Sequence, residues 1–320
     1  MNLLSARRLI ATVFAVTTSA AMAQAYPNKP INFIVPFPAG SATDLTARVL
    51  SEHISKSAGQ AIVVDNKAGA NGTIGTAAAA KAAPDGYSFV VATSTTHAAN
   101  ASLYRKLPYD PIKDFTPVSQ LADIPFVMLV HPSVPADTAQ KFVAHAQANP
   151  DKLAWGHGSS GSLIPGNALV THNKLKMVAV PYKGVQPAVA DALGNQVQLV
   201  FADIANAMPQ VKAGKLKALA VTSAAEHPLL PGVQPLSVVV PGFEMNSWFA
   251  MYAPAGTPAA AVNKMNEWVR AALKDPTVQS KLTGQGFRIT PSSPAELGVF
   301  TAKETIKWAK AVTAAGITPE

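Results

Sequence analysis

The feature that most constrains the fold is a repeated alternation between short apolar runs and segments with helical periodicity. In the first part of the chain, the apolar runs and the helical patterns that follow them span 31–35 and 45–56, 61–64 and 73–82, and 88–92 and 98–104. Such alternation favours a sheet of parallel strands covered by helices. A polar, proline-rich stretch at 108–115 then leads along the surface toward a second series.

A second series of the same kind occupies the middle of the chain. Strands are expected at 126–130, 153–156, 176–180, 196–201 and 216–222, and helices at 138–148, after Pro187, and at 204–213. Residues 157–175 are expected to form a loop, because Pro165 and Gly166 disfavour a helix there. Gly194 and Gly214 stand where a glycine commonly ends a helix.

The end of the chain carries a strand pattern at 247–253, followed by helical patterns at 258–274, 276–283 and 294–315. Because the last two helices have no sheet of their own, we expect them to pack on the first series. The sequence therefore predicts an α/β protein with two domains. Residues 26–125 plus 248–320 form domain 1, and residues 126–247 form domain 2. Each is expected to hold a mixed, mostly parallel sheet flanked by helices, as in hinged two-domain receptors.

Residues 1–25 have the features of a secretory signal peptide. Arg7 and Arg8 precede a short apolar run at 9–16, and small residues follow as far as Ala25. Cleavage is expected after Ala25 or Ala23. The run is too short for a transmembrane helix, and no cysteine is present at the cleavage point to carry a lipid anchor. We therefore expect an exported, periplasmic protein.

The composition excludes several kinds of site. The chain contains no cysteine, so disulfides, thiolate metal sites and cysteine nucleophiles are excluded. The histidines show no H-x-x-x-H or H-E-x-x-H spacing, so we expect no metal site and no cofactor. Arg7 and Arg8 contribute two of the eight net positive charges, which leaves 8 − 2 = +6 on the mature chain. Because the basic residues are scattered singly, they favour mild attraction of anions over nucleic-acid binding.

The junction Val35–Asp44 is the strongest candidate for a binding turn. An extended apolar run ends there and an amphipathic helix begins. Ser41 and Asp44 have the spacing of a capping box, and Gly40 lets the backbone come close to a ligand. The unpaired amides and the positive dipole end of a helix favour an anion. A capped turn without a ligand is the plainer interpretation, but the chain repeats the arrangement.

Four further strand ends, at 92–96, 155–162, 180–184 and 201–203, carry hydroxyl side chains or free amides. The segment from Gly156 to Gly161 has G-x-G-x-x-G spacing, but no acidic residue lies about twenty positions further on to bind a ribose. It is interpreted instead as a nest of amides with two hydroxyls, suited to a carboxylate. In open α/β sheets, ligands bind at this edge, beyond the carboxyl ends of the strands.

The other polar residues at these ends have simpler alternatives. Tyr182 is able to hydrogen-bond a ligand oxygen, whereas the neighbouring Lys183 is more simply explained as a solvated lysine. Asp203 is well placed to cap the helix that follows it. Ser160, His157 and Asp203 are the residue types of a hydrolase triad, but the G-x-S-x-G nucleophile motif is absent. A serine hydrolase is therefore only the weaker alternative.

Taken together, several motifs resemble the Bug-type receptors of the tripartite tricarboxylate transporter family. They are Tyr26-Pro27, the turn at 36–44, Gly69–Gly75, Ala80–Tyr87, Pro181–Gly184 and Ala213–Lys215. The resemblance covers nearly all of the mature chain. It implies a Venus-flytrap periplasmic binding protein, type II-like, that closes over a small carboxylate, uses no cofactor and is not an enzyme.

In that family, loops of both domains hold a ligand carboxylate through backbone amides and ordered water. Carried onto this chain, the resemblance implies as binding residues Phe37, Ala39, Gly40, Ser41, Thr93, Ser94, His157, Ser159, Ser160, Tyr182 and Asp203. Two departures limit the transfer. Ser41 stands where the family usually has a second glycine, and Leu163–Asn167 replaces a segment that commonly carries a histidine and a leucine.

The resulting hypothesis is a monomeric solute receptor that delivers a small organic carboxylate to inner-membrane transporter subunits. A receptor that reports its ligand to a membrane sensor kinase is an alternative with the same binding site. The sequence leaves the ligand open among dicarboxylates, tricarboxylates, amino acids and aromatic acids.

Overall fold

A computed structural model describes residues 26–319 of the chain. The expected signal peptide at 1–25 lies outside the described residues. Over the described part of the chain, no helix combines the length and the apolar character needed to cross a bilayer.

The strands form two groups that meet at one long strand. They are β1 (Ile31–Val35), β2 (Ile62–Asn66), β3 (Ser88–Thr93), β4 (Phe115–Val130), β5 (Leu153–His157), β6 (Met177–Pro181), β7 (Leu199–Asp203), β8 (Lys217–Val221), β9 (Asn246–Pro254) and β10 (Arg288–Ile289). Their order is β2-β1-β3-β9-β4-β7-β5-β6, with β8 and β10 also paired to β4. The parallel pairs lie toward the two ends, and the pairs made by β4 and β9 are antiparallel. The sheet is thus mixed, with more antiparallel pairing at its centre than the sequence predicted.

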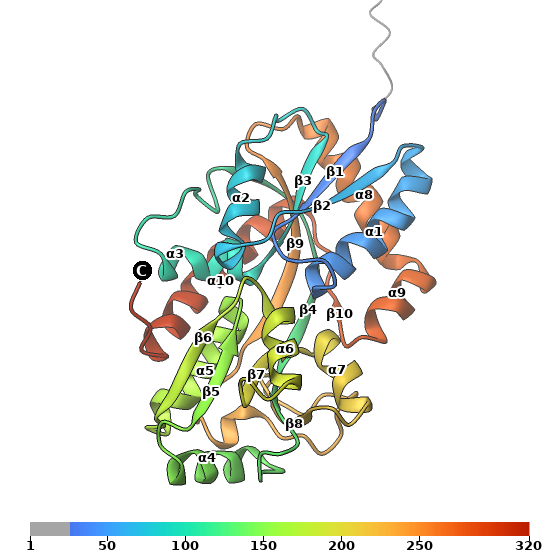
Figure 1. The fold of residues 1–320 in the computed structure, drawn as a ribbon. Helices are drawn as coiled ribbons and strands as arrows, with labels where there is room; N and C mark the ends of the chain where they lie inside the picture. The colour runs from blue at the N-terminus through green and yellow to red at the C-terminus, as the bar shows by residue number, and fades with distance from the viewer. Residues whose placement is uncertain (1–25, 320) are drawn as a thin grey trace, which may run out of the picture.

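Strand β4 joins the two groups. Residues 115–125 pair with β9, whereas residues 126–130 pair with β7 and residues 127–130 also pair with β8. Figure 1 shows β4 and β9 running between the group of β1 to β3 and the group of β5 to β8. The sequence predicted a strand only at 126–130, and this prediction is wrong for the first part of β4, which begins at Phe115. Register shifts after Pro117 and after Gln120 interrupt the period-two alternation, which hid this half of the strand.

Helices cover both faces of the first group. The helical elements here are α1 (Ala42–Ala58), η1 (Ala70–Gly72), α2 (Thr73–Ala80), η2 (Thr95–Ala99), α3 (Asn100–Leu103), α8 (Ala259–Lys274), α9 (Pro276–Thr283) and α10 (Pro294–Ala314). Alternate residues of β1 point to opposite faces. Phe33 packs in the cluster that holds Leu50 of α1 and Val269 of α8, whereas Ile34 packs with Ala79 of α2 and Trp308 of α10. The last helices thus pack on the first group, as expected.

The second group is layered in the same way. Its helices are α4 (Ala139–Ala148), α5 (Ser160–His172), α6 (Val185–Leu193), α7 (Ile204–Lys212) and the short η3 (Leu236–Val238). Val200 of β7 packs in the cluster that holds α6 and α7, and Phe201 packs in the cluster that holds α4 and α5. Each face of the sheet therefore has its own core.

Helix α5 corrects the prediction of a loop at 157–175. Pro165 lies inside the helix, where it removes a backbone hydrogen bond, yet the helix continues to His172. Packing explains this. A side chain at position 166 would put its Cβ 2.2 Å from the Trp155 ring, so Gly166 allows the helix to lie directly on that indole. Tertiary packing overrides the low helix propensity of both residues.

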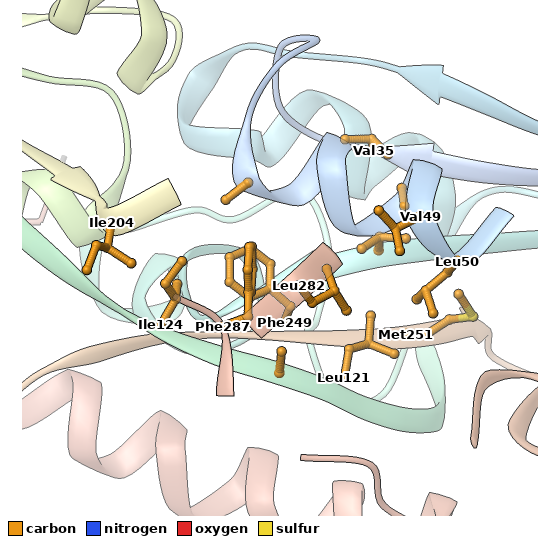
Figure 2. Close-up of a cluster of buried hydrophobic side chains, with 14 of the residues drawn as sticks. Val35, Val49, Leu50, Leu121, Ile124, Ile204, Phe249, Met251, Leu282 and Phe287 are labelled. Atoms are coloured by element: carbon orange, nitrogen blue, oxygen red, sulfur yellow. The ribbon is translucent and has the colours of Figure 1, made fainter. Parts of the chain in front are cut away.

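One hydrophobic cluster passes from the first group into the second. Figure 2 shows Leu50 of α1, Leu121 of β4 and Met251 of β9 in line with Ile204, the first residue of α7. The predicted domain boundary after residue 125 coincides with the point where β4 changes its partner from β9 to β7. The division into two domains stays a prediction.

Candidate functional site

Strand ends and helix starts of both groups surround one cavity of about 370 Å³, open solvent at its mouth included. Its lining residues are Phe37, Ser41, Ala42, Thr43, Thr93, Thr95, Phe126, Ser159, Val185, Gln186, Asp203, Ser247 and Phe249. The lining is formed by hydroxyl side chains, helix starts and three phenylalanines. Asp203 is the one ionisable residue in this set. The cavity therefore combines polar groups with apolar side chains, and no basic side chain lines it.

The start of α1 pairs its own amides. The Ser41 Oγ accepts from the Asp44 amide at 3.1 Å, and the Asp44 carboxylate accepts from the Gly40 amide at 3.0 Å. The sequence predicted a capping box, in which that carboxylate would bind the Ser41 amide instead. Arg48 Nε and Asn66 Nδ2 also donate to Asp44, each at 2.9 Å.

These bonds decide the charge of Asp44. Its burial opposes ionisation, but the bonds from Arg48, the Gly40 amide and Asn66 outweigh that effect and hold the pKa of the carboxyl below its usual range. The turn is thus a self-contained network around one carboxylate. The amides of Gly40 and Asp44, which the sequence predicted to be free for a ligand, are bonded within the protein.

The start of α5 is satisfied in a similar way. The Ser162 Oγ accepts from the amides of Gly158 and Ser159, at 2.9 and 3.1 Å. Ser159 and Ser162 together form a capping box. The nest of amides predicted here for a carboxylate is therefore partly filled by the protein's own hydroxyl, although Ser159 itself lines the cavity.

The start of α6 differs from both. Its N-cap residue is Gly184, which has no side chain to accept from the first amides. The third residue of the helix is Pro187, which has no N–H. The amides of Val185 and Gln186 are consequently the donors left by helix geometry, and both residues line the cavity. No side chain caps the start of α6, in contrast to the starts of α1 and α5.

The start of α7 places a carboxylate in the cavity. Asp203 is only 7% exposed, and its Oδ1 accepts from the Asn206 amide at 3.1 Å as the N-cap of α7. The Asn206 Nδ2 donates to both carboxylate oxygens, at 2.7 and 2.9 Å. Burial raises the pKa of Asp203, and the bonds from Asn206 only partly offset that rise.

Gln186 links the two sides of the cavity. Its Nε2 donates to the Asn206 Oδ1 at 3.2 Å and to the Gly40 carbonyl at 3.4 Å. A second link joins the Oγ1 of Thr95 and the Oγ of Ser160, which lie 2.7 Å apart. In this structure the first and second groups of strands are therefore in polar contact across the cavity.

An unusual backbone carries Thr95. Residues Thr95–Ala99 form a π-helix, a feature often found at functional sites. His97 is fully buried in it and stacks on Tyr252, with ring centroids 4.1 Å apart. Burial lowers the pKa of His97 to about 3, so this histidine is neutral at physiological pH. It supports the segment and lies outside the cavity lining.

The predicted binding residues fall into three sets. Phe37, Ser41, Thr93, Ser159 and Asp203 line the cavity. Gly40, Ser94 and Ser160 lie behind it: Gly40 accepts from Gln186, the hydroxyls of Ser94 and Ser247 lie 3.1 Å apart, and Ser160 pairs with Thr95. Ala39 is exposed and belongs to neither set.

His157 and Tyr182 form the third set, because they line a separate groove with Pro181 and Lys183. The Tyr182 hydroxyl donates to Asp191 at 2.7 Å. Its proton is therefore already used in a bond within the protein, although the sequence predicted a bond to a ligand oxygen. Burial lowers the pKa of His157 to about 4, which keeps its ring neutral. Neither residue reaches the cavity in this structure.

The arrangement gives no nucleophile for a hydrolase. The Ser160 hydroxyl pairs with Thr95, and the Asp203 carboxylate is bound by Asn206. Across residues 26–319, no hydrogen bond joins His157 to Ser160 or Asp203, and no group of three histidine or carboxylate side chains has the geometry of a metal site.

Sequence reasoning missed several lining residues, chiefly Thr95, Val185, Gln186, Ser247 and Phe249. Val185 has an apolar side chain, and a single glutamine after a strand end is not by itself a recognisable binding motif. Their signal was positional: they directly follow the Pro181–Gly184 strand end that the sequence had singled out.

Comparison with known proteins identifies the family. Residues 46–317 match the tripartite tricarboxylate transporter family receptor. BugT of Bordetella pertussis is 35% identical over 300 residues, which cover 92% of this chain and 91% of BugT. Rpa4515 of R. palustris, solved with adipate, is 33% identical with a TM-score of 0.88 and covers 92% of this chain and 100% of its own.

MatC of Rhodopseudomonas palustris, solved with malate, is 32% identical with a TM-score of 0.85; the match covers 90% of this chain and 100% of that chain. These similarities confirm the predicted α/β periplasmic binding protein fold. They also confirm a solute receptor in place of an enzyme, which removes the hydrolase alternative. The chain belongs to the receptors of the tripartite tricarboxylate transporter family.

Proposed function

We propose that this receptor binds a small organic carboxylate in the cavity between its two groups of strands. The observation that carries the proposal is the start of α6, where Gly184 and Pro187 leave the amides of two residues that line the cavity, Val185 and Gln186, without a side-chain cap. A carboxylate oxygen supplies the missing acceptor, and the helix dipole favours its charge. Adipate in Rpa4515 and malate in MatC are ligands of the same class.

Binding is proposed to proceed by closure of two domains. The division at residues 125/126 and 247/248 falls within β4 and within β9, so these two strands are the connections. The bonds from Gln186 to Gly40 and between Thr95 and Ser160 then form only when the domains meet. A ligand that fits the cavity adds its own hydrogen bonds to these contacts and so favours the closed form over the open form.

The cellular role follows from the family. An N-terminal signal peptide, cleaved after Ala25 or Ala23, would export the receptor to the periplasm as a monomer. There it is proposed to deliver the carboxylate to inner-membrane transporter subunits. Capture of those subunits by the loaded receptor supports delivery, whereas capture of a membrane sensor kinase in their place would support the signalling alternative.

Thermal unfolding tests the binding proposal. The full chain is expressed with its leader, and the processed protein is refolded to remove carried-over ligand. Small carboxylates, beginning with adipate and malate, are compared with their amides. A carboxylate at one hundred times its Kd adds about 2.7 kcal/mol to the free energy of unfolding. That raises Tm by several degrees. If no carboxylate shifts Tm, or if the amides shift it equally, the proposal is wrong.

A further inference from the structure

The cavity contains hydrogen-bond acceptors that an anion does not satisfy. Asp203 is its single ionisable lining residue, and Asn206 donates three hydrogen bonds to its carboxylate. An ionised carboxylate has about four acceptor positions. Of the three bonds from Asn206, Oδ1 accepts two and Oδ2 accepts one. Oδ2 can therefore accept one further hydrogen bond.

Gln186 supplies a second acceptor of this kind. Its Nε2 is held by Asn206 and Gly40, which fixes the orientation of the side-chain amide. The opposite atom, Oε1, is buried and has no hydrogen-bond partner. Thr93, 4% exposed, adds a buried Oγ1 that also lacks a partner and can accept or donate. All three side chains line the same cavity.

A ligand whose only polar group is a carboxylate would bind unfavourably beside the acceptors of Asp203, Gln186 and Thr93. Its charge would lie in one small cavity with the Asp203 carboxylate and with no basic side chain in the lining. Buried acceptors without donors also weaken binding, because they lose water and gain nothing. A donor on the ligand removes both defects, since it pairs with Asp203 and Gln186 while the ligand carboxylate caps α6.

We propose that the ligand carries a hydrogen-bond donor beside its carboxylate, either a hydroxyl or an ammonium group, which Asp203 and Gln186 accept. The ligand class is therefore hydroxy acids and amino acids in preference to plain mono- or dicarboxylates. This inference rests on the proposed function, because the ligand carboxylate holds the other end. A hydroxyl supplies one donor, whereas an ammonium supplies three donors and a charge opposite to that of Asp203.

Matched series of ligands test the inference on the processed, refolded protein by calorimetry. The sets are propionate, lactate and alanine; succinate, malate and aspartate; and glutarate, 2-hydroxyglutarate and glutamate. In the set that fits the cavity, a donor-bearing member is expected to bind at least about tenfold more tightly than the plain acid. Plain acids that bind as tightly as their analogues in every set overturn the inference but leave carboxylate binding intact. Absence of binding in all sets contradicts the proposed function itself.

Variants assign the preference to these residues. Asp203→Asn keeps an N-cap acceptor for α7, and its preference for the donor-bearing ligand is expected to fall below about threefold. The amino acid should lose more affinity than the hydroxy acid, because only the amino acid loses a charge pair. Gln186→Met removes the unpartnered oxygen and should reduce the preference as well.

Asp191→Asn is the matched control. It makes the same change at a carboxyl that binds Tyr182 outside the cavity, so the preference should stay as in the native chain. A preference that survives both Asp203→Asn and Gln186→Met overturns the assignment. If Asp203→Asn fails to fold, Gln186→Met and the native series still decide the question.

Discussion

The starts of α1 and α6 both contribute residues to the cavity lining but differ in how their first amides are capped. Both helices follow a strand of their sheet, and both begin with amides that lack an intrahelical partner. In α1, the side chains of Ser41 and Asp44 accept from two amides of the turn, those of Asp44 and Gly40. In α6, Gly184 has no side chain to cap the helix, and the first two helical residues, Val185 and Gln186, line the cavity.

This difference separates stability from binding. A helix start that caps itself adds to folding free energy and has little left to offer a ligand. A helix start without a cap forgoes that stabilisation and keeps its donors available. Capping signals in a sequence therefore mark the turns that hold the protein together, and the amides proposed to bind the ligand lie where such signals are missing.

The largest effect is expected when α6 is given the cap that α1 has. Gly184 has an extended backbone, with φ of −177°, so other residues fit its conformation. In Gly184→Asp the new carboxylate accepts from the α6 amides and repels a ligand anion. Affinity for the carboxylate ligand, measured by calorimetry, is expected to fall at least about a hundredfold, or about 2.7 kcal/mol.

Gly184→Ala separates capping from crowding. A Cβ at this position would lie 2.8 Å from Pro38 Cδ in the first group, so both variants hinder the approach of the two groups. The alanine variant has no capping oxygen and should lose only about tenfold in affinity. Equal losses in the two variants would show that crowding, and not competition for the amides, is responsible.

The next effect concerns α1 alone. In Asp44→Asn the buried carboxylate loses its charge-assisted bonds to Gly40, Arg48 and Asn66. Such bonds are each worth about 1.5–3 kcal/mol, so the free energy of unfolding at pH 7 should fall by about 2 kcal/mol. Ligand affinity should change less than about threefold, because Asp44 does not line the cavity. Denaturant titration and calorimetry measure the two quantities.

The same variant gives a pH test. The pKa of Asp44 is held below its usual range in the folded state, so its stabilisation is complete above the unfolded pKa of about 3.9 and is lost as pH falls through the lower, folded value. The stability difference between native chain and variant should therefore be constant between about pH 5 and 7 and shrink below about pH 4. A difference that grows in acid would refute the assigned role.

Ser41→Ala should have a smaller effect of the same kind. Loss of an N-cap hydroxyl costs about 1 kcal/mol of stability. Although Ser41 lines the cavity, its Oγ already accepts from Asp44, so affinity should stay within about threefold. A tenfold loss of affinity with unchanged stability would instead support the direct contact with a ligand that the family resemblance implied.

The sequence predicted the elements whose side chains carry their own signal. The strand at 31–35, the α1 cap and the Asp203 cap follow from apolar runs and capping residues, and the structure contains all three. It failed where packing decides. Helix α5 depends on Gly166 lying against Trp155, and the first half of β4 is hidden by register shifts.

The same distinction explains the site. Five of the eleven predicted residues line the cavity, because hydroxyl and acidic side chains at strand ends are visible in a sequence. Val185 and Gln186 were missed, since uncapped backbone amides at a helix start and a single glutamine side chain give no distinctive signal in a sequence. Thr95 depends on a π-helix, and the sequence gives no local signal for that backbone.

The smallest effect is expected at Thr93, which extends the contrast between satisfied and unsatisfied groups to side chains. Its buried Oγ1 lacks a partner, whereas the Oγ1 of nearby Thr96 accepts from the Thr93 amide and pairs with His97. Thr93→Val should leave the free energy of unfolding unchanged or raise it by up to about 1 kcal/mol. It should also weaken ligand binding by about threefold.

Thr96→Val is the matched control, because it removes a paired hydroxyl outside the cavity lining. It should lower the free energy of unfolding by about 1–3 kcal/mol and leave affinity within error of the native value. Denaturant titration and calorimetry on both variants give the comparison. If Thr93→Val is destabilising and binds normally, its hydroxyl serves the fold as that of Thr96 does. The unpartnered oxygen would then not mark the ligand's position.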